Sequence, residues 1–439
     1  MPERLKVLMS AYACEPGKGS EPEVGWRWAL QMARFHEVTV LTRANNRPGI
    51  ERALGALHGR QPLPRFVYHD LHPLLLDLKR RVNATKLYYV LWQRSARDVV
   101  ARLHQENRYD LLHHVTFAGF RYPAAIWGHG AACIWGPIGG IKSIPSSLLP
   151  WRHPPSVWHE AFRRANNLWQ GAPFHALRKR ARATTLILVS TREMKQALAC
   201  LGFDSEVMQT IGLQPAELPL QPHRQSEGPL RLLFVGKVIT LKGIDLALEA
   251  LKQSQTSAVL TVIGTGNYLE AAKRQADRLG LCERVRFEGR LPREEVLKVY
   301  PHHAVFLIPS LHDTGSYAVI EAMFNGLPVI CLDCGGPAVV VPAGCGRKVP
   351  LGRRATVIAD LAAAIRWYDQ NRGLILEHGK AAREVVLRQF DWDKKGEQMN
   401  ERYQDAVAQA RTQQDRPDHR PGCSGSSSSN TRFSELDVE

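Results

Sequence analysis

The chain has 439 residues, of which 44% are hydrophobic and 23% are charged. One core rarely organises so many residues, so the length predicts two large domains. The composition excludes a disordered, a collagen-like or a multi-span membrane protein. The 58 Lys and Arg residues exceed the 42 Asp and Glu residues, which gives a formal net charge of +16. This excess favours anionic partners, among them nucleotide phosphates, nucleic acids and anionic lipids.

Along the N-terminal half, strand-like and helix-like segments alternate. An apolar run at 6–10 predicts a strand, a loop rich in Gly and Pro follows, and a helix is predicted over 26–35. Such alternation is typical of a parallel, doubly wound sheet, and we predict a first Rossmann-like α/β domain over 1–213. Its further predicted strands are 37–42, 111–115, 133–135 and 186–190.

The segment 214–228 is rich in Pro and Gln and predicts a linker, after which the alternation restarts. We predict a second Rossmann-like domain over 229–390, a helix over 391–412 and a disordered tail over 413–439, because the Ser-rich end of the chain cannot form a core. The second domain has predicted strands at 230–235, 259–263, 285–287, 305–309 and 328–332, and predicted helices at 245–253 and 268–279.

The eight cysteines are scattered, and no secretory leader precedes the first strand, so we expect reduced thiols and a cytoplasmic location. Cys331 and Cys334 form a CxxC pair, but a zinc site needs a second pair at matching spacing, which Cys345 alone does not supply. We therefore predict no metal site. The uncharged stretch 122–141 is long enough to span a membrane, yet its five glycines and two prolines favour buried strand and loops.

The strongest chemical signal lies at 309–336. A predicted strand ends there, a loop of small residues follows, and a helix carries Glu321. The carboxyl end of a parallel strand facing a helix N-terminus is where such sheets bind anions and nucleotides. Asp313 and Glu321 bracket the loop and suit acceptors for paired hydroxyl groups. Taken alone, the same two acids also fit a helix cap and a solvated helix face.

Two lysines follow another strand end in the second domain. The strand ends at Gly236, Lys237 and Lys242 come next, and Gly243 precedes a helix. Cations in this position suit a diphosphate leaving group, whose charge develops as its bond breaks. The alternative for an isolated pair is two surface lysines beside a turn.

These two motifs, in this order and at this separation, resemble the retaining, nucleotide-sugar-dependent glycosyltransferases of family 4 (glycosyl transferases group 1). The usual family motif has two Glu with seven residues between them, and Asp313 and Glu321 keep that spacing. The resemblance extends over 6–410 and is strongest over 230–336. It implies a GT-B fold, in which two Rossmann-like domains enclose the active site and the last helix crosses back onto the first domain.

The resemblance also implies roles for individual residues. Asp313 would contact the donor sugar, Glu321 the ribose hydroxyls, and Lys237 and Lys242 the diphosphate. Asp is shorter than Glu by one methylene, and the loop after it departs from the family's common Gly-Phe-Gly-Leu-Pro, which leaves the donor sugar open. The remaining residues expected to bind the nucleotide sugar are Gly19, Ser20, Gly236, Gly266, Gly289, Arg290, Thr314, Gly315, Ser316 and Tyr317.

Two histidines end the predicted strand 111–115. Strand alternation sends His113 and His114 to opposite faces, so we expect one of them to face the cleft, where the family often has a histidine. In the alternative interpretation, His114 hydrogen-bonds a backbone group.

Two stretches combine apolar residues at helical spacing with clustered cations. They suit contact with an anionic membrane surface, or the buried face of an ordinary helix. The first comprises Leu71, Leu75, Leu78 and Val82 beside Lys79, Arg80 and Arg81, and the second comprises Trp158, Phe162, Ala165 and Trp169 near Arg163, Arg164 and 178–180.

The resemblance implies transfer of a hexosyl group from a UDP- or GDP-linked sugar to a hydroxyl of a glycan or lipid-linked polysaccharide precursor, without a required metal. Such an enzyme would be cytoplasmic or peripheral on the inner face of the plasma membrane. One alternative is a non-hydrolysing-type sugar-nucleotide epimerase, which needs no acceptor. A nucleic-acid-binding protein fits the charge, but the sequence has no zinc finger, RNP-type strand or basic recognition helix. An inactive scaffold with the same fold is the last alternative.

Overall fold

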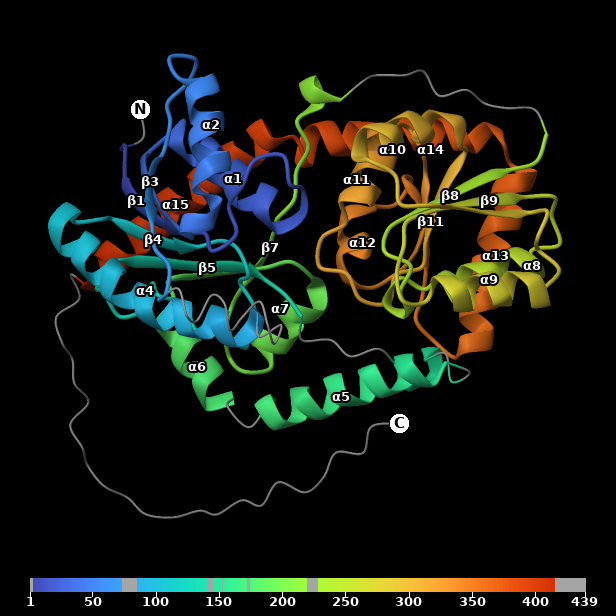
Figure 1. Cartoon of the computed structure of the whole chain (residues 1–439), viewed down its shortest axis with the longest axis horizontal. Helices are drawn as coiled ribbons and strands as arrows, with labels where there is room; N and C mark the ends of the chain where they lie inside the picture. The colour runs from blue at the N-terminus through green and yellow to red at the C-terminus, as the bar shows by residue number, and fades with distance from the viewer. Residues whose placement is uncertain are drawn as a thin grey trace, which may run out of the picture.

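The computed structural model describes residues 3–72, 85–140, 145–149, 151, 153–171, 174–218 and 228–414. It contains two α/β domains side by side, each built around one parallel sheet (Figure 1). Residues 219–227 of the predicted linker and 415–439 of the predicted tail lie outside the described residues, as do Leu75, Leu78, Val82 and the adjoining cations Lys79, Arg80 and Arg81.

The first domain has a seven-stranded sheet in the order β3-β2-β1-β4-β5-β6-β7. Every neighbouring pair is parallel, and the register pairs Val7 of β1 with Val38 of β2 and with Leu111 of β4. The prediction of a doubly wound α/β domain is therefore confirmed. The strands are β1 (Lys6–Ser10), β2 (Glu37–Thr42), β3 (Arg65–Tyr68), β4 (Leu111–His114), β5 (Ala132–Ile138), β6 (Leu186–Val189) and β7 (Glu206–Val207).

The helix predicted over 26–35 begins six residues earlier, because the Gly- and Pro-rich stretch is partly helical. Pro22 lies in the first turn, where the missing N–H of proline costs nothing, and Gly25 allows close packing, since a Cβ there would lie 2.2 Å from the Ala13 carbonyl oxygen. The helices of this domain are α1 (Ser20–Ala33), α2 (Arg47–Leu57), α4 (Thr85–Asn107), α5 (Pro154–Gly171), α6 (Phe174–Arg182) and α7 (Arg192–Ala199), with short 3₁₀ turns η1 (Ala44–Asn46), η2 (Ser146–Leu148) and η3 (Pro215–Glu217).

The second domain has a six-stranded parallel sheet in the order β10-β9-β8-β11-β12-β13. Its strands are β8 (Arg231–Val235), β9 (Val259–Ile263), β10 (Val285–Gly289), β11 (Val305–Ile308), β12 (Val329–Leu332) and β13 (Gly346–Val349). Its helices are α8 (Ile244–Gln253), α9 (Leu269–Arg278), α10 (Arg293–Val299), α11 (Tyr317–Phe324), α12 (Gly335–Val340), α13 (Arg354–Gln370) and α14 (Gly373–Gln389), with 3₁₀ turns η4 (Thr240–Lys242) and η5 (Tyr300–His302).

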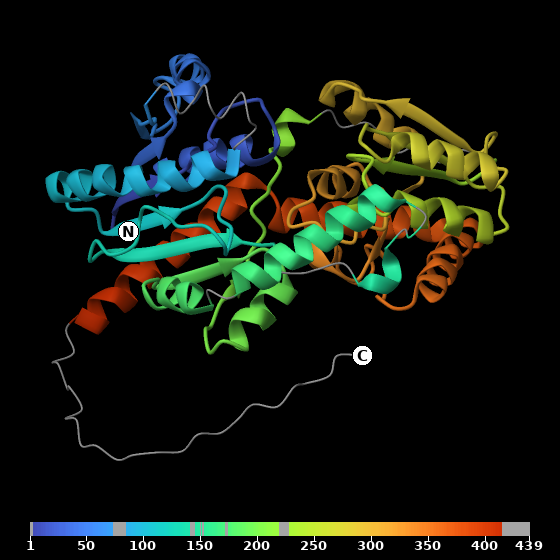
Figure 2. The ribbon, with the colours of Figure 1, turned by 60° about the horizontal axis from the view of Figure 1, so that its bottom comes forward.

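The two domains are joined by a double crossing of the chain. The backbone N–H of Leu213 donates to the Phe390 carbonyl (2.7 Å), and the N–H of Trp392 donates to the Leu213 carbonyl (2.9 Å). From there α15 (Trp392–Gln414) runs back across the first domain and packs against α1 (Figure 2). It extends two residues beyond the predicted end at 412.

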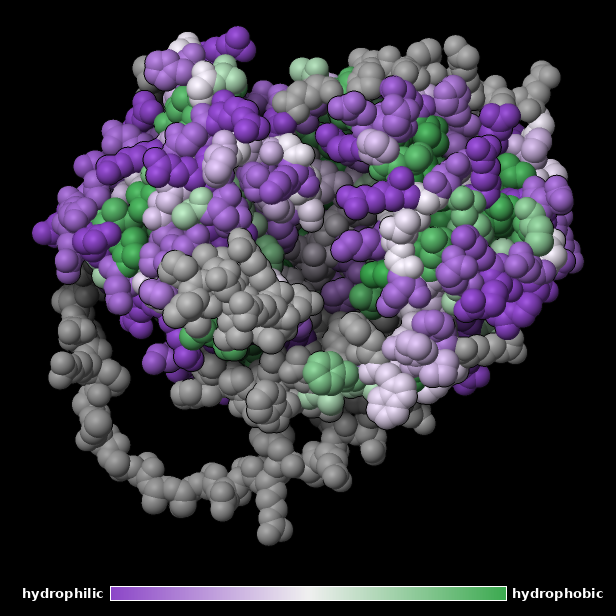
Figure 3. All heavy atoms as spheres, in the orientation of Figure 1, coloured by the Kyte–Doolittle hydropathy of each residue, from purple (hydrophilic) through white to green (hydrophobic). Residues whose placement is uncertain are grey.

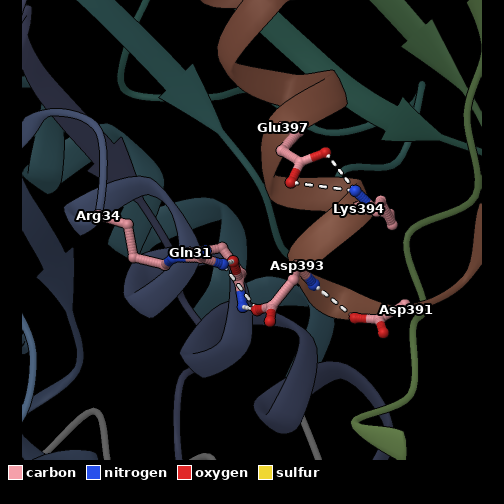
Figure 4. A network of polar contacts seen from close by, with 6 residues as sticks. All are labelled: Gln31, Arg34, Asp391, Asp393, Lys394 and Glu397. Carbon is pink, nitrogen blue, oxygen red and sulfur yellow. Dashed lines mark hydrogen bonds and ion pairs between the residues drawn. The ribbon is translucent and has the colours of Figure 1, made fainter.

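Polar contacts fix the start of α15 on α1. Gln31 and Arg34 of α1 both donate to Asp393 Oδ1, at 3.0 and 2.6 Å, and Asp391 caps the helix by accepting from the Asp393 N–H (Figure 4). Beneath them, the rings of Trp28 and Trp392 pack edge to face with centroids 5.2 Å apart. Both rings are almost fully buried, so this contact anchors the crossing helix.

The stretch 122–141 contains loops and the buried strand β5, as its glycines and prolines predict. Among the helices that the structure describes, none is both long and apolar enough to cross a membrane.

Candidate active site between the domains

A cavity of about 740 Å³ lies between the two domains. On one side it is lined by the loop after β1 and the start of α1, and on the other by the loops that follow β8, β10 and β11. The carboxyl ends of strands from both sheets therefore converge on it, as expected for a ligand site of doubly wound sheets. Hydrophilic side chains predominate on the surface where the domains face each other (Figure 3).

Most of the predicted site residues line this cavity. From the first domain these are Gly19 and Ser20, and from the second Gly236, Lys237, Lys242, Arg290, Asp313, Gly315, Ser316, Tyr317 and Glu321.

In the second domain, close packing at a glycine brings the segment with the two lysines against the segment with Asp313. Gly243 has a φ of +68°, and a Cβ there would lie 2.0 Å from the Pro309 carbonyl oxygen. The loop that carries Lys237 and Lys242 (the lysine loop) and the loop that carries Asp313 (the acidic loop) are therefore in direct backbone contact. As a result, Lys242 Nζ donates to Asp313 Oδ2 in an ion pair whose side chains are 21% and 11% exposed. Lys237, at the end of β8, is exposed at the cavity wall.

Glu321 lies on α11 with only 6% of its surface exposed. Its Oε1 accepts from Arg293 at 2.9 Å, and its Oε2 accepts from the Tyr300 hydroxyl at 3.2 Å. Burial raises the pKa of Glu321, while Arg293 and the Tyr300 hydrogen bond oppose this shift. Ser316, and not Asp313, occupies the N-cap position of α11, and its side chain makes no capping hydrogen bond. The alternative of Asp313 as a helix cap and Glu321 as a solvated residue is therefore wrong.

Three residues predicted to bind the nucleotide sugar do not line the cavity. A Cβ at Gly266 would lie 2.2 Å from the Val238 carbonyl oxygen, so this glycine lets the loop after β9 pass against the lysine loop. Gly289 ends β10 with a φ of +72° and turns the chain toward Arg290. The Thr314 methyl group packs against Gly139 of the first domain, since a Cβ at Gly139 would lie 2.5 Å from it.

The two histidines of β4 are buried, and neither lines the cavity. His113 donates from Nε2 to the Gly136 carbonyl (2.9 Å), and its Nδ1 contacts the Tyr403 hydroxyl (2.6 Å). His114 contacts the Tyr89 hydroxyl from Nε2 (3.1 Å). The expectation that one of them faces the cleft is wrong, because both faces of β4 are covered, by α15 and by α4. Burial lowers the pKa of His113 to about 4 and that of His114 to about 3, so both rings are neutral at pH 7.

Ser20 of α1 was predicted, but three further cavity residues on the same helix, Glu23, Trp26 and Arg27, were not. Glu23 accepts from Arg27 Nε and from the Gly17 N–H, both at 2.7 Å, and Trp26 lies beside them in the cavity wall. The spacing of Glu23 and Arg27 by four residues is a helical signal, but it crosses the predicted helix start at 26, with Glu23 in the predicted loop and Arg27 in the predicted helix. Arg293 was missed because no helix was predicted at its position.

The cavity lining carries an excess of positive charge. Its cations outnumber its acids, so an anionic ligand is favoured there over a cationic one. The cations are Arg27, Lys237, Lys242, Arg290 and Arg293, and the acids are Glu23, Asp313 and Glu321.

A metal-ligand cluster is not found among the residues that the structure describes: no group of three or more His, Cys, Asp or Glu side chains is placed to hold an ion. Cys331 and Cys334 are buried as free thiols in the core of the second domain. Burial raises the pKa of the Cys331 thiol, which makes it inert.

A family model described as glycosyl transferases group 1 matches residues 219–383. The glycogen synthase of Mycobacterium tuberculosis is 27% identical over 184 residues, which cover 41% of this chain and 44% of that protein. The putative teichuronic acid biosynthesis glycosyltransferase TuaC of Bacillus subtilis is 27% identical over 293 residues, 64% of this chain and 71% of that protein. The chain thus spans less than half of the first relative and 71% of the second.

The solved structure of HepE from Anabaena, in complex with UDP and glucose, superposes with a TM-score of 0.55 at 15% identity. The superposition covers 91% of this chain and 99% of HepE. The likeness extends over both domains, and the chain has the GT-B fold, as the sequence predicted.

Proposed function

We propose that the protein is a glycosyltransferase that moves a hexosyl group from a nucleoside-diphosphate sugar to a hydroxyl of a glycan or lipid-linked precursor, with retention of configuration. The observation that carries the proposal is the interdomain cavity, whose lining brings together Lys237, Lys242, Asp313 and Glu321. The match of 219–383 to the group 1 model and the UDP and glucose bound by HepE support it.

In this mechanism the diphosphate takes the place of Asp313 as the partner of Lys242. Lys242 lies within reach of the cavity, and Lys237 is exposed beside it, so both can neutralise charge as the sugar–phosphate bond breaks. The backbone N–H groups of 315–317 at the start of α11 add donors of fixed orientation. Asp313, released from Lys242, accepts a hydrogen bond from a hydroxyl of the departing sugar.

Glu321 holds the ribose of the donor. Arg293 and Tyr300 fix its carboxylate at two oxygens, and a carboxylate fixed in this way is a strong acceptor for two neighbouring hydroxyls. The bond between the anomeric carbon of the sugar and the diphosphate oxygen breaks, and the acceptor hydroxyl oxygen forms its bond to that carbon on the same face, which retains configuration. The proton of the acceptor hydroxyl passes to the departing diphosphate oxygen. The lysines supply the positive charge, and we expect activity to persist in EDTA.

The first test is a thermal-shift screen with UDP, GDP, ADP and their sugars. A ligand at a hundred times its Kd stabilises the folded state by about 2.7 kcal/mol. We expect one nucleotide to raise Tm, and Glu321→Ala to abolish that rise. Glu295→Ala is the matched control, because Glu295 is an exposed glutamate that pairs with Lys298 outside the cavity.

A Tm that responds to none of these nucleotides would contradict the proposal. An epimerase, which shares the architecture, would form product without any acceptor, so assays with and without acceptor separate the two activities. A shift produced only by nucleic acid would favour the nucleic-acid-binding alternative.

We also propose that α5 contacts an anionic membrane surface on the cytoplasmic face. Trp158 and Phe162, spaced by four residues, are 76% and 71% exposed, whereas Glu160 is buried and contacts Arg164. The alternative that this stripe is a buried helix face is therefore wrong for these two residues. The following helix, α6, exposes Arg178, Lys179 and Arg182, and exposed aromatic residues beside cations suit anionic lipid.

Replacing both aromatic residues, in Trp158→Ser/Phe162→Ser, is expected to weaken binding to anionic vesicles at least tenfold, because burial of each side chain in lipid contributes about 1.5–3 kcal/mol. Flotation with phosphatidylglycerol-containing vesicles measures this. Leu376→Ser is the control, since Leu376 is a 46% exposed apolar residue on α14 of the other domain. Equal flotation of wild type and the double variant would refute the contact.

A further inference from the structure

A second cavity, of about 520 Å³, lies on the second domain and shares no lining residue with the interdomain cavity. Its floor is formed by α8, α9 and the start of α13, and Leu149 and Trp151 of the first domain cover it. Its volume is in the range of small-molecule sites.

The covering segment is attached to the second domain on both sides of Trp151. Ser147 Oγ donates to the Gly352 carbonyl at 3.1 Å. After Trp151, the His153 ring packs edge to face against Tyr268, with centroids 4.9 Å apart, and Ser156 hydrogen-bonds Thr240. Figures 1 and 2 both show one end of α5 beside the second domain. The cavity is therefore built by two domains in contact.

One wall carries a buried polar group with no partner. Gln275 is 8% exposed; its Nε2 donates to the Asp245 carbonyl (3.2 Å) and to Glu249 Oε1 (3.0 Å), while its Oε1 is buried without a hydrogen bond. Both neighbours of Nε2 are acceptors, so the amide orientation is determined. An unsatisfied buried carbonyl is unfavourable and rare in folded proteins. Oε1 is shielded from the cavity as the side chain stands, so the Gln275 amide must turn toward the cavity for a ligand hydroxyl to supply the missing donor.

The charges of the wall balance. Arg354 pairs with Asp245 at 2.9 Å and with Glu249 at 2.8 Å, which leaves it no excess charge for a phosphate. Arg278 is the other cation of the lining. A nucleotide or a free phosphate would be repelled by the Glu249 carboxylate, and no net positive charge of the wall would offset that repulsion. The wall therefore favours a neutral ligand with many hydroxyls.

Aromatic rings complete the cavity. Tyr268 is 5% exposed in the floor, whereas Trp151 is 64% exposed at the rim. The C–H face of a sugar packs on such rings, while its hydroxyls donate to amide and carboxylate oxygens and accept from guanidinium groups. All of these groups are present here.

We infer that this cavity is a secondary carbohydrate-binding site that takes a neutral oligosaccharide, with Trp151 as its aromatic platform and Gln275 Oε1 as a hydroxyl acceptor. The site is independent of the donor. It would hold a glycan chain on the protein whether or not the interdomain cavity is occupied.

The test is calorimetric titration of the full chain, without nucleotide, with maltohexaose, cellohexaose and mannohexaose. We expect at least one to bind, and Trp151→Ala to weaken that binding at least tenfold. Leu376→Ala is the control, because Leu376 is a 46% exposed apolar residue on α14 outside the cavity lining, and it should bind like wild type.

Gln275→Met is the second variant and should also weaken binding tenfold; if it does not fold, the exposed Trp151 still decides the outcome. Absence of binding by all three oligosaccharides, or binding unchanged in Trp151→Ala, would overturn the inference. Binding that Glu321→Ala abolishes would place the sugar in the interdomain cavity and also overturn it. Competition by inorganic phosphate or UDP would show that the ligand is an anion, against the inference. The nucleotide screen above is a separate measurement, so failure of either proposal is recognised independently.

Discussion

Lys242→Ala is expected to lower kcat by about a hundredfold to a thousandfold, because removal of one preorganised charge donor from a developing anion has an effect of that size. The Lys242 ammonium group reaches Asp313 at the cavity wall, and the lysine side chain is only 21% exposed. Its field therefore acts on the diphosphate with little screening by water. Steady-state turnover of the nucleotide sugar identified by the thermal-shift screen measures the effect.

A lysine outside the cavity provides the control. Lys252 is exposed at the end of α8, so Lys252→Ala removes the same charge from the same domain without touching the cavity. Lys242→Ala leaves Asp313 without its cation, and Lys242→Ala/Asp313→Asn separates the loss of the lysine from the repulsion by the acid. A kcat within threefold of wild type in Lys242→Ala would refute the role of this residue.

The sequence predicted the central strands because their apolar runs are buried on both faces. The strands β3, β7 and β13 were missed. They lie at or near sheet edges and are short, and residues such as Arg65 and Arg347 interrupt their apolar pattern. The central part of each sheet is thus a local property of the chain, whereas three of the four edge strands depend on pairing with a neighbouring strand. The exception is β10, an edge strand that was predicted at 285–287.

The site residues divide in the same way, into those that a local sequence pattern marks and those that depend on contacts between distant parts of the chain. Asp313 and the two lysines lie in loops that follow strand ends, and Glu321 lies on the helix after one of these loops, so the sequence itself marks the carboxyl edge of the sheet. Glu23 reaches the cavity only because two domains close on each other, and no local pattern records that contact. Gly266 was wrongly predicted to bind the nucleotide sugar. A glycine that leaves space for a ligand and a glycine that leaves space for a neighbouring backbone give the same signal in the sequence.

Helical periodicity has a related limit. It reports that one face of a helix differs from the other but not which face is turned inward. Trp158 and Phe162 fit a core stripe as well as a surface stripe, and only their exposure in the structure, together with the burial of Glu160, distinguishes the two possibilities. Long-range packing therefore determines whether α5 is a core helix or a contact surface.

Lys395→Met is expected to stabilise the protein at and below pH 7 and to remove a pH dependence of its stability. Lys395 lies at the crossing of α15, 2% exposed, where its Nζ donates to the Gln209 carbonyl (2.5 Å) and lies 5.4 Å from the Trp28 ring. Burial, with a smaller contribution from Arg402, lowers the pKa of Lys395 from its ordinary 10.5 to about 7. That difference corresponds to roughly 5 kcal/mol as an upper bound.

The sign of the pH dependence of the free energy of unfolding follows from the number of protons that the folded and unfolded states bind. Between pH 7 and about 10 the unfolded chain binds a proton at this lysine that the folded protein does not, so the free energy of unfolding rises with pH there, by at most about 1.4 kcal/mol per unit. Below pH 7 both states are protonated, and the full penalty for burying the charge remains. Methionine keeps the length and apolar stem of lysine and carries no charge, so it removes both the penalty and the slope.

Calorimetric Tm values at pH 6, 7, 8 and 9 measure this slope, and the adjacent lysine is the control. Lys394 is 55% exposed and pairs with Glu397 at 3.0 Å on the outer side of the same turn (Figure 4), so Lys394→Met should keep the slope of wild type. A wild-type Tm that falls between pH 7 and 9, or a slope that persists in Lys395→Met, would show that another group controls the crossing. The expected result would show that burial of the Lys395 ammonium group lowers the free energy of unfolding at the place where α15 packs on the first domain.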